Sequence, residues 1–251
     1  MVLLLAICGW IVAGPEGARR AVSGGIPRSS GPAISREAMF RLFGARLLSP
    51  VDVPALFGIL AGVCRRAGLS WLPDLYYLAT PGNMNAYALG GPDGAAIVLT
   101  EGLLRGMTPG EIAGILAHEV AHITNNDAWT MSWAAALNRA IEWTALTGLS
   151  ALRTHDAQAG RRLAAVLSAA PAIGQLLCLA LSRIREMDAD ATAMELTQDS
   201  RGLVAALDKL ERHHTGWPVL APAAFEDGPA RLLRSHPATS ERVGTLLQLA
   251  H

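Results

Sequence analysis

Lysine is nearly absent from this chain. Lys209 is the single lysine among 21 basic residues, and the basic residues are balanced by 21 acidic ones in a chain of 251. A protein that binds nucleic acid normally carries a basic excess or a basic stripe on one face. The sequence has neither, so we expect no nucleic-acid partner.

Cysteine is also scarce. Cys8, Cys64 and Cys178 lie far apart, and no two of them form a CxxC pair. This number and spacing argue against a disulfide framework and against a zinc site made of thiolates. We expect three free thiols, packed in apolar surroundings in a reducing compartment.

Aromatic residues make up only 5% of the chain, yet its apolar fraction is 51% and its mean hydropathy is +0.29. The apolar residues are clustered. Residues 1–13 are uncharged but shorter than the roughly 20 residues that cross a bilayer, and they lack the basic start of a secretory signal. We expect residues 1–13 to form a short membrane anchor or interfacial helix. Arg19 and Arg20 follow it and favour a cytoplasmic location for the rest.

A second apolar run, residues 163–182, contains no charge and has arginine on both sides. Its length suffices to span a membrane. The alternative is a buried core helix kinked at Pro171. Together with residues 128–152, in which Arg139 and Glu142 are spaced to pair, this run predicts an apolar helical hairpin over 128–182.

The remaining pattern predicts a mostly α-helical α+β chain with a small antiparallel sheet. Residues 14–53, rich in Gly, Pro and Ser at their start, are expected to be a linker and lead-in segment. A helix is expected over 54–66, with Gly68 suited to end it. The stretch 74–80 is typical of a strand, and "NAYALGG" and "AAIVLT" are typical of a hairpin.

A strong helix signal begins at Thr108. Thr108, Pro109 and Glu111 have the spacing of a capping box with proline in the first turn. The apolar residues that follow fall on one stripe at helical spacing: Ile112, Ile115, Leu116, Val120 and Ile123. His118 and His122 lie beside this stripe, one turn apart on a common flank.

The sequence between these histidines is HExxH. Neutral imidazoles at i and i+4 can bind one zinc ion, and catalytic zinc typically has three protein ligands and one open position. Glu119 lies between them, where it would accept a proton from a water molecule. The alternative is a solvated polar face on an ordinary helix.

A third ligand is offered by "SRIREMDADATAMEL". Glu186 completes a His-His-Glu set, and Asp190, one turn later, can accept the free ring N–H of a ligand histidine. Asp188 and Glu195 in the same stretch are expected to be solvated. Because this charged turn directly follows a long apolar run, we interpret Glu186 and Asp190 as residues of a metal site and not as ordinary surface carboxylates.

Four blocks in one order resemble the HtpX-type membrane zinc metalloproteases, relatives of the Ste-type CAAX prenyl endopeptidases in the gluzincin class. The blocks are "NAYALGG", "VLTEGLLRGMTPGEIAGILAHEVAHITNND", "SRIREMDADATAMEL" and "SHPATSERV". The resemblance runs from about residue 55 to the C-terminus. It implies a gluzincin metallopeptidase domain over 54–251, with the hairpin 128–182 inserted into it and the small sheet beside the HExxH helix.

The resemblance also implies roles for individual residues. One zinc ion would be bound by His118, His122 and Glu186, with Glu119 as general base and Asp190 oriented on a ligand histidine. His236 and Arg242 would face the metal, where they stabilise the oxyanion or gate the open position. Asn85 and Ala86 would line the cleft on an edge strand, against which an extended substrate lies.

The implied function is a zinc-dependent endopeptidase acting on unfolded or membrane-associated proteins, in a bacterial inner membrane with its catalytic domain facing the cytoplasm. The relatives usually carry a longer N-terminal membrane hairpin, of which residues 1–13 remain here. Three alternatives stay open. The chain could be a compact soluble peptidase, a non-catalytic scaffold in a larger assembly, or a zymogen in which His236 occupies the fourth zinc position.

Overall fold

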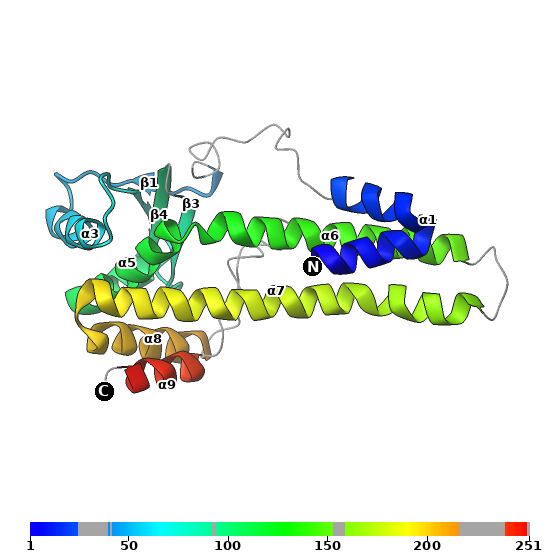
Figure 1. The fold of residues 1–251 in the computed structure, drawn as a ribbon. Helices are drawn as coiled ribbons and strands as arrows, with labels where there is room; N and C mark the ends of the chain where they lie inside the picture. Colours follow the sequence, from blue (N-terminus) through cyan, green and yellow to red (C-terminus); the bar gives the residue numbers. More distant parts are fainter. Residues whose placement is uncertain (25–39, 41, 92–93, 153–158, 216–238, 250–251) are drawn as a thin grey trace. The chain divides into compact units, whose positions relative to one another are not determined.

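The computed structural model describes residues 1–24, 40, 42–91, 94–152, 159–215 and 239–249 (Figure 1). The chain divides into two compact units. One comprises Met1–Gly31 and Thr130–Ser182, and the other comprises Pro32–Trp129 and Arg183–His251. The helices α6 (Asp127–Leu152) and α7 (Ala159–Thr197) each belong partly to both units.

The second unit contains a four-stranded sheet in the order β1-β2-β4-β3. Its strands are β1 (Arg46–Leu47), β2 (Asp74–Leu78), β3 (Ala86–Gly91) and β4 (Gly94–Thr100). The expected strand and hairpin are confirmed, but the sheet is mixed, because β2 and β4 run parallel. Residues 79–85 connect β2 to β3, which lies one strand position further along the sheet. The chain then turns back, and β4 fills the position between β2 and β3. β4 is buried along nearly its whole length, as is typical of a central strand.

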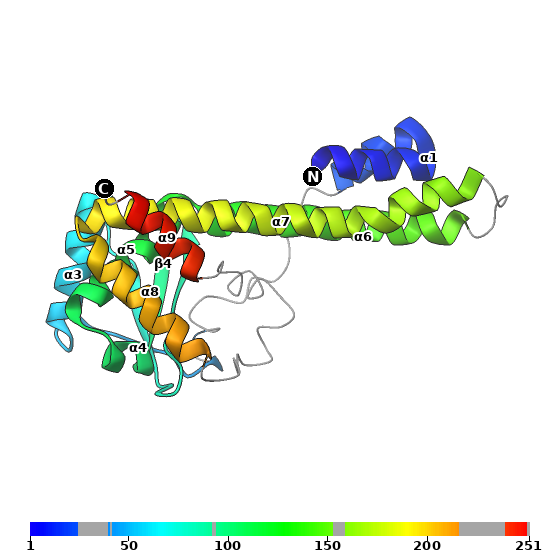
Figure 2. The same cartoon turned by 90° about the horizontal axis from the view of Figure 1, so that it is seen from below.

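Helices cover this sheet. The expected helix over 54–66 is α3 (Pro54–Arg66), and Gly68 follows it with a φ of 74°. The HExxH helix is α5 (Pro109–Thr124), preceded by the short α4 (Glu101–Gly106). α5 packs against α3, β3 and α8 (Ser200–Thr215), and α8 packs against α9 (Thr239–Leu249; Figure 2). The apolar stripe of α5 lies in the main core with residues of all these elements.

The first unit contains α1 (Val2–Gly24) with parts of α6 and α7. α1 is broken at Ala13 and Gly14, and Gly14 has a φ of 61° that favours glycine. A side chain on Gly9 or Gly17 would overlap the backbone of the other, so the two halves of α1 pack closely. Residues 14–24, expected to be linker, therefore form a second helical arm.

The α6 and α7 portions of this unit lie side by side as the expected helical hairpin. Asn138 of α6 lies against Gly174 of α7, where a Cβ would overlap its amide oxygen. The amide nitrogen of Asn138 donates to Glu142 at 2.8 Å. Glu142 therefore pairs with Asn138 in the interior of the hairpin, in place of the Arg139 pairing expected from spacing.

Two helical stretches, Val2–Ser23 and Arg161–Thr197, are long and apolar enough to cross a membrane. The break in α1 leaves arms of about ten residues, and at about 1.5 Å per residue neither arm alone crosses a hydrocarbon core. α7 is different. Its apolar window is only 17% buried, so it is not the buried core helix of the alternative interpretation.

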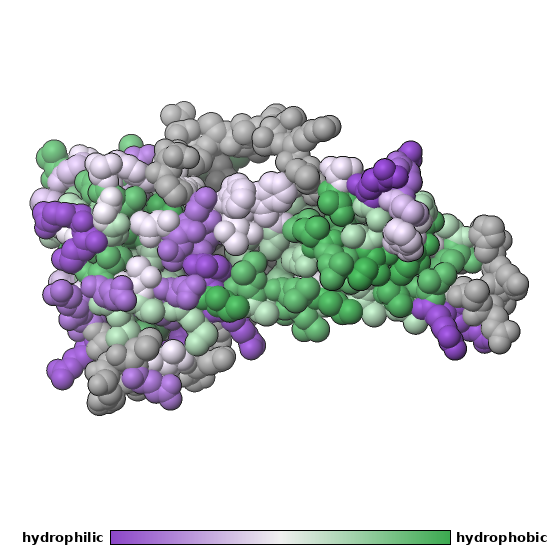
Figure 3. All heavy atoms as spheres, viewed as in Figure 1, coloured by the Kyte–Doolittle hydropathy of each residue, from purple (hydrophilic) through white to green (hydrophobic). Residues whose placement is uncertain are grey.

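The exposed side of α7 is rich in leucine and isoleucine. Its large exposed residues within the apolar run are Leu163, Val166, Ile173, Leu176, Leu177 and Leu179. Figure 3 shows a continuous apolar surface, in green, over much of the first unit. An apolar surface of this kind marks a site of contact with a membrane or a partner.

Candidate metal centre

The metal centre is built on α5, and the start of this helix is fixed by the predicted capping box. The Thr108 hydroxyl accepts from the Glu111 backbone N–H, and the Glu111 carboxylate accepts from the Thr108 N–H at 2.7 Å. The side chain of Lys209 on α8 binds the same carboxylate at 2.7 Å. These contacts fix where α5 begins and tie its first turn to α8.

His118, His122 and Glu186 are brought together as predicted. One ligand atom from each of the three lies within 4.8 Å of the other two. The two histidine Nε2 atoms are 3.0 Å apart, and each lies 3.5 Å from a carboxylate oxygen of Glu186. Ligands bound at about 2.1 Å in a tetrahedral arrangement would be separated by about 3.4 Å. The cluster therefore has the size of a metal site.

The far nitrogen of each imidazole is held by a carboxylate. His118 Nδ1 lies 2.9 Å from Asp190, and His122 Nδ1 lies 2.7 Å from Asp127. A hydrogen on each Nδ1 leaves both Nε2 lone pairs directed at each other and at Glu186. This arrangement is repulsive unless a positive charge lies among the three groups. The donor set is also the His-His-Glu set of catalytic zinc sites, so these residues fit a metal ion.

The charges around the cluster shift the pKa values of its members. Burial alone lowers the pKa of His122, but the hydrogen bonds to Asp127 and Glu186 outweigh it and raise the pKa to about 10. Burial raises the pKa of Asp190, but hydrogen bonds from Arg242 and His118 outweigh it and bring the pKa to about 2. A metal ion bound at these nitrogens would therefore compete with a proton.

Arg242 lies in this cluster but is engaged with its carboxylates. Its Nε and Nη2 bind the two oxygens of Asp190 at 2.7 and 2.6 Å, and its Nη1 lies 3.4 Å from Glu186. The side chain of Arg242 is 5% exposed. These contacts favour a role in holding Asp190 and the charge balance of the ligands over direct contact with a substrate.

Glu119 is buried on the same turn of α5 as the two histidines. Asn85 immediately precedes the edge strand β3, and Ala86 is its first residue. The backbone of Asn85 is held by Thr100, with its N–H donating to the hydroxyl at 2.8 Å. His236, the other residue expected to face the metal, lies outside the residues that the structure describes.

Two residues of the site were not predicted. Asp127 binds His122 on one side and, through its other oxygen, lies 2.6 Å from Arg185 Nε. Asp127 ends the stretch "AHEVAHITNND", five residues beyond His122, which is not a helical spacing. Arg185 directly precedes the predicted ligand Glu186, and this adjacency was the one sequence signal that pointed to Arg185.

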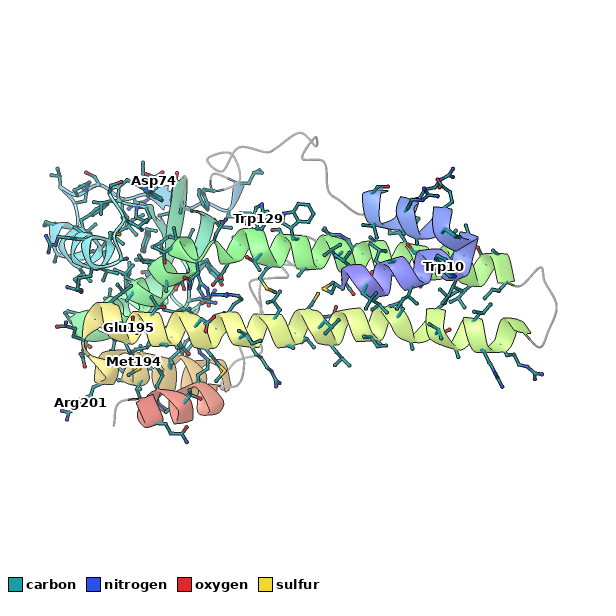
Figure 4. All side chains as sticks on the ribbon, viewed as in Figure 1. Trp10, Asp74, Trp129, Met194, Glu195 and Arg201 are labelled. Atoms are coloured by element: carbon teal, nitrogen blue, oxygen red, sulfur yellow. The ribbon has the colours of Figure 1, made fainter. Side chains whose placement is uncertain are left out.

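The surroundings of Glu186 agree with the expected solvation of its neighbours. Asp188 is exposed, although it forms an ion pair with Arg185 at 3.2 Å. Glu195 is exposed, while Met194 beside it packs against the core (Figure 4). The free cysteines also agree with expectation: Cys8 and Cys64 are buried, and Cys178 is half-buried.

Comparison with known proteins supports the same assignment. Residues 54–250 match peptidase family M48. A protease HtpX homologue from Acaryochloris marina is 38% identical over 226 residues, which is 82% of this chain and 76% of the relative. Another from Nostoc punctiforme is 31% identical over 266 aligned positions, covering 98% of this chain and 91% of the relative. The chain belongs to peptidase family M48 and is a metalloprotease of the HtpX type.

Proposed function

We propose that this metalloprotease is a zinc-dependent endopeptidase, with one zinc ion per chain bound by His118, His122 and Glu186. The observation that carries the proposal is the convergence of these three ligand atoms within 4.8 Å. Two nitrogen donors and one carboxylate oxygen are the ligand set of catalytic zinc in peptidases. We further propose that 54–251 is the peptidase domain and that 128–182 is an insertion within it.

Zinc bound here would polarise the scissile carbonyl and lower the pKa of a bound water molecule to about 7. In our proposal the carboxylate of Glu119 accepts the proton of the attacking water and delivers it to the leaving amine. General-base catalysis of this kind contributes a factor of about 10² to 10⁴ in rate. Because Glu119 is buried beside the ligands, its carboxylate is shielded from bulk water.

The remaining predicted residues have supporting roles in this proposal. Arg242 holds Asp190, which orients His118. His236 would hydrogen-bond the oxyanion of the tetrahedral intermediate, and losing one such donor typically costs a factor of about 10² to 10³.

We propose that substrates bind as an added strand along β3, beginning near Asn85 and Ala86. β3 is at the edge of the sheet, and α5 packs beside it. Main-chain hydrogen bonds along such an edge give affinity with little dependence on side chains. Unfolded or membrane-associated polypeptides, whose backbones are free to extend, are the substrates that this arrangement suits.

We place the protein in a bacterial inner membrane, with the peptidase domain facing the cytoplasm. The exposed apolar surface of α7 supports membrane insertion. Arg19 and Arg20 lie on the second arm of α1, after its break at Ala13 and Gly14, and favour the cytoplasmic side.

The substitution Glu119→Gln tests the proposed mechanism. The variant should bind one zinc ion per chain, because Glu119 is not a ligand, and should lose casein cleavage by a factor of about 10² or more. Metal content would be measured by elemental analysis, and cleavage would be followed in detergent.

A matched control is Glu195→Gln, which changes an exposed glutamate on α7 and should cleave casein like the wild type. Cleavage by Glu119→Gln at the wild-type rate would remove Glu119 from the mechanism. Wild-type protein that holds no zinc would contradict the proposed cofactor.

A further inference from the structure

The second nitrogen of His122 is the starting point. His122 Nδ1 lies 2.7 Å from Asp127 Oδ2, and Asp127 is only 5% exposed. The other oxygen of Asp127 lies 2.6 Å from Arg185 Nε. A charged chain of three side chains, from Arg185 through Asp127 to His122, therefore leads to the metal site.

The chain from Arg242 through Asp190 to His118 has the same chemical order. Arg242 binds both oxygens of Asp190 at 2.6 to 2.7 Å, and Asp190 lies 2.9 Å from His118 Nδ1. Each histidine thus has its own aspartate, and each aspartate has its own arginine. The two aspartates come from different elements, since Asp127 begins α6 while Asp190 lies on α7.

We propose that Asp127 and Arg185 are positioning residues for the metal centre and set its affinity through His122. This inference rests on the proposed zinc site. The carboxylate of Asp127 fixes the hydrogen on Nδ1 and so presents the Nε2 lone pair to the metal. Arg185, with its Nε 2.6 Å from the other oxygen of that carboxylate, balances its charge. Outer partners of this kind typically change metal affinity by a factor of about 10 to 100.

The two chains differ in their exposure to water. The side chain of Arg185 is 24% exposed and also pairs with the exposed Asp188, whereas Arg242 is 5% exposed and is committed to the buried carboxylates. The His122 chain is therefore held less tightly. Losing Asp127 should weaken metal binding less than losing Asp190 does.

A purely structural role for Asp127 would have another signature. Asp127 is the first residue of α6, and a carboxylate at the N-terminus of a helix stabilises that helix. In that role its loss would lower the unfolding temperature of the metal-free protein and leave metal affinity unchanged. Metal affinity therefore distinguishes positioning from helix stabilisation.

The test measures zinc affinity of the full chain in detergent by competition with a chromophoric chelator. Asp127→Asn should raise the Kd for zinc by a factor of about 10 to 100. Arg185→Gln should raise it less, and Arg185→Lys should recover part of the loss because it keeps the charge. The double variant should match Asp127→Asn alone to within about twofold, since Arg185 acts through Asp127.

The control is Asp188→Asn, which removes the other carboxylate on Arg185 but does not touch a histidine. Its Kd should stay at the wild-type value. The visible spectrum of the cobalt-substituted protein should change for Asp127→Asn and not for Asp188→Asn, because only the first alters the geometry of a ligand.

A wild-type Kd for Asp127→Asn would overturn the inference. Losses in the double variant that multiply would also overturn it, because Arg185 would then act independently. Arg185→Gln carries the test if Asp127→Asn does not fold, since Arg185 is partly exposed. If the wild type itself binds no zinc, the proposed function fails, whereas zinc binding that is indifferent to Asp127 overturns this inference alone.

Discussion

The only lysine of the chain, Lys209, forms an ion pair at the start of α5, the helix that carries HExxH. Lys209 on α8 binds Glu111 at 2.7 Å and the carbonyl of Gly106 at 3.2 Å. Burial raises the pKa of Glu111, but the bonds from Lys209 and from Thr108 outweigh it and leave that pKa lowered. One ionised side chain therefore serves both the cap of α5 and the contact of α5 with α8.

This contact predicts a pH-dependent stability. The lowered pKa of folded Glu111 means that its contribution is present above the unfolded pKa of about 4.3 and is lost as pH falls below it. Glu111→Gln keeps the capping-box hydrogen bond and removes the charge. It should lower the free energy of unfolding by about 0.5 to 1 kcal/mol near neutral pH.

Denaturant unfolding of the wild type and Glu111→Gln at several pH values measures the difference. The two curves should converge between pH 5 and about 3 as Glu111 becomes protonated. Lys209→Met should show a similar dependence, because it removes the same pair from the other side. A difference that is constant with pH would show that the charge is not responsible.

Among whole elements, the crossing of α5 and α8 is set by glycine. A Cβ on Gly114 would lie 2.8 Å from the Leu203 Cα, and one on Gly202 would lie 2.7 Å from the Gly110 carbonyl oxygen. These approaches bring the two backbones close together, four residues before His118. The packing of α8 therefore contributes to the position of the first ligand.

Gly114→Ala should lower the free energy of unfolding by about 1 to 3 kcal/mol, because α8 must move away to accommodate the methyl group. The matched control is Gly58→Ala on α3, where a Cβ meets nothing within 4 Å. That control should stabilise the protein by about 0.5 to 1 kcal/mol. Thermal unfolding of both variants measures the contrast, and an equal effect at the two sites would contradict this account.

Local signals predicted some elements well and others poorly. The bounds of α3 and the capping box of α5 were predicted because proline, threonine and glycine act within a few residues. The parallel pairing of β2 with β4 was not, because strand order depends on the path of residues 79–85. The second arm of α1 was also missed, since Gly14 and Pro15 resemble a linker whether or not a helix follows them.

At the scale of the whole molecule, each unit has its own apolar core, but the hairpin has a second apolar surface that lies outside any core. Leu5, Ile141 and Leu167 are buried inside the first unit, while Leu176 and Leu179 are 65% and 43% exposed. Trp10 on α1 and Trp129 at the start of α6 are also exposed (Figure 4). Tryptophan is common at membrane interfaces, and leucine at the membrane interior.

Charge on this surface should weaken membrane retention. Arginine in the middle of a membrane helix costs about 2.5 to 3.5 kcal/mol on insertion scales. The variant with both Leu176→Arg and Leu179→Arg should therefore shift from the membrane pellet to the supernatant on carbonate extraction.

Val51→Arg is the control, since Val51 is an exposed apolar residue of the second unit, away from α7 in the sequence. It should remain in the pellet with the wild type. Retention of the double variant would contradict insertion of this stretch of α7.

The sequence by itself determined the parts of this protein that depend on short-range periodicity and on matched motifs. Helical spacing put His118 and His122 on one face, and an uncharged run predicted α7. The pair Glu186 and Asp190, one turn apart after the apolar run, added a candidate third ligand and its partner, and the resemblance of four blocks implied the same roles.

The tertiary structure alone decided which charges meet. Arg242 of α9 binds Asp190 of α7, and Arg185 of α7 binds Asp127 of α6. The two residues of each pair are more than 50 residues apart in the chain, and no local signal specifies how their helices pack. An ion pair depends on the packing angle and phase of two elements, whereas ligand spacing on one helix depends only on its pitch. For this reason the ligands were predictable from the sequence, and the side chains that hold two of them in place were only partly so.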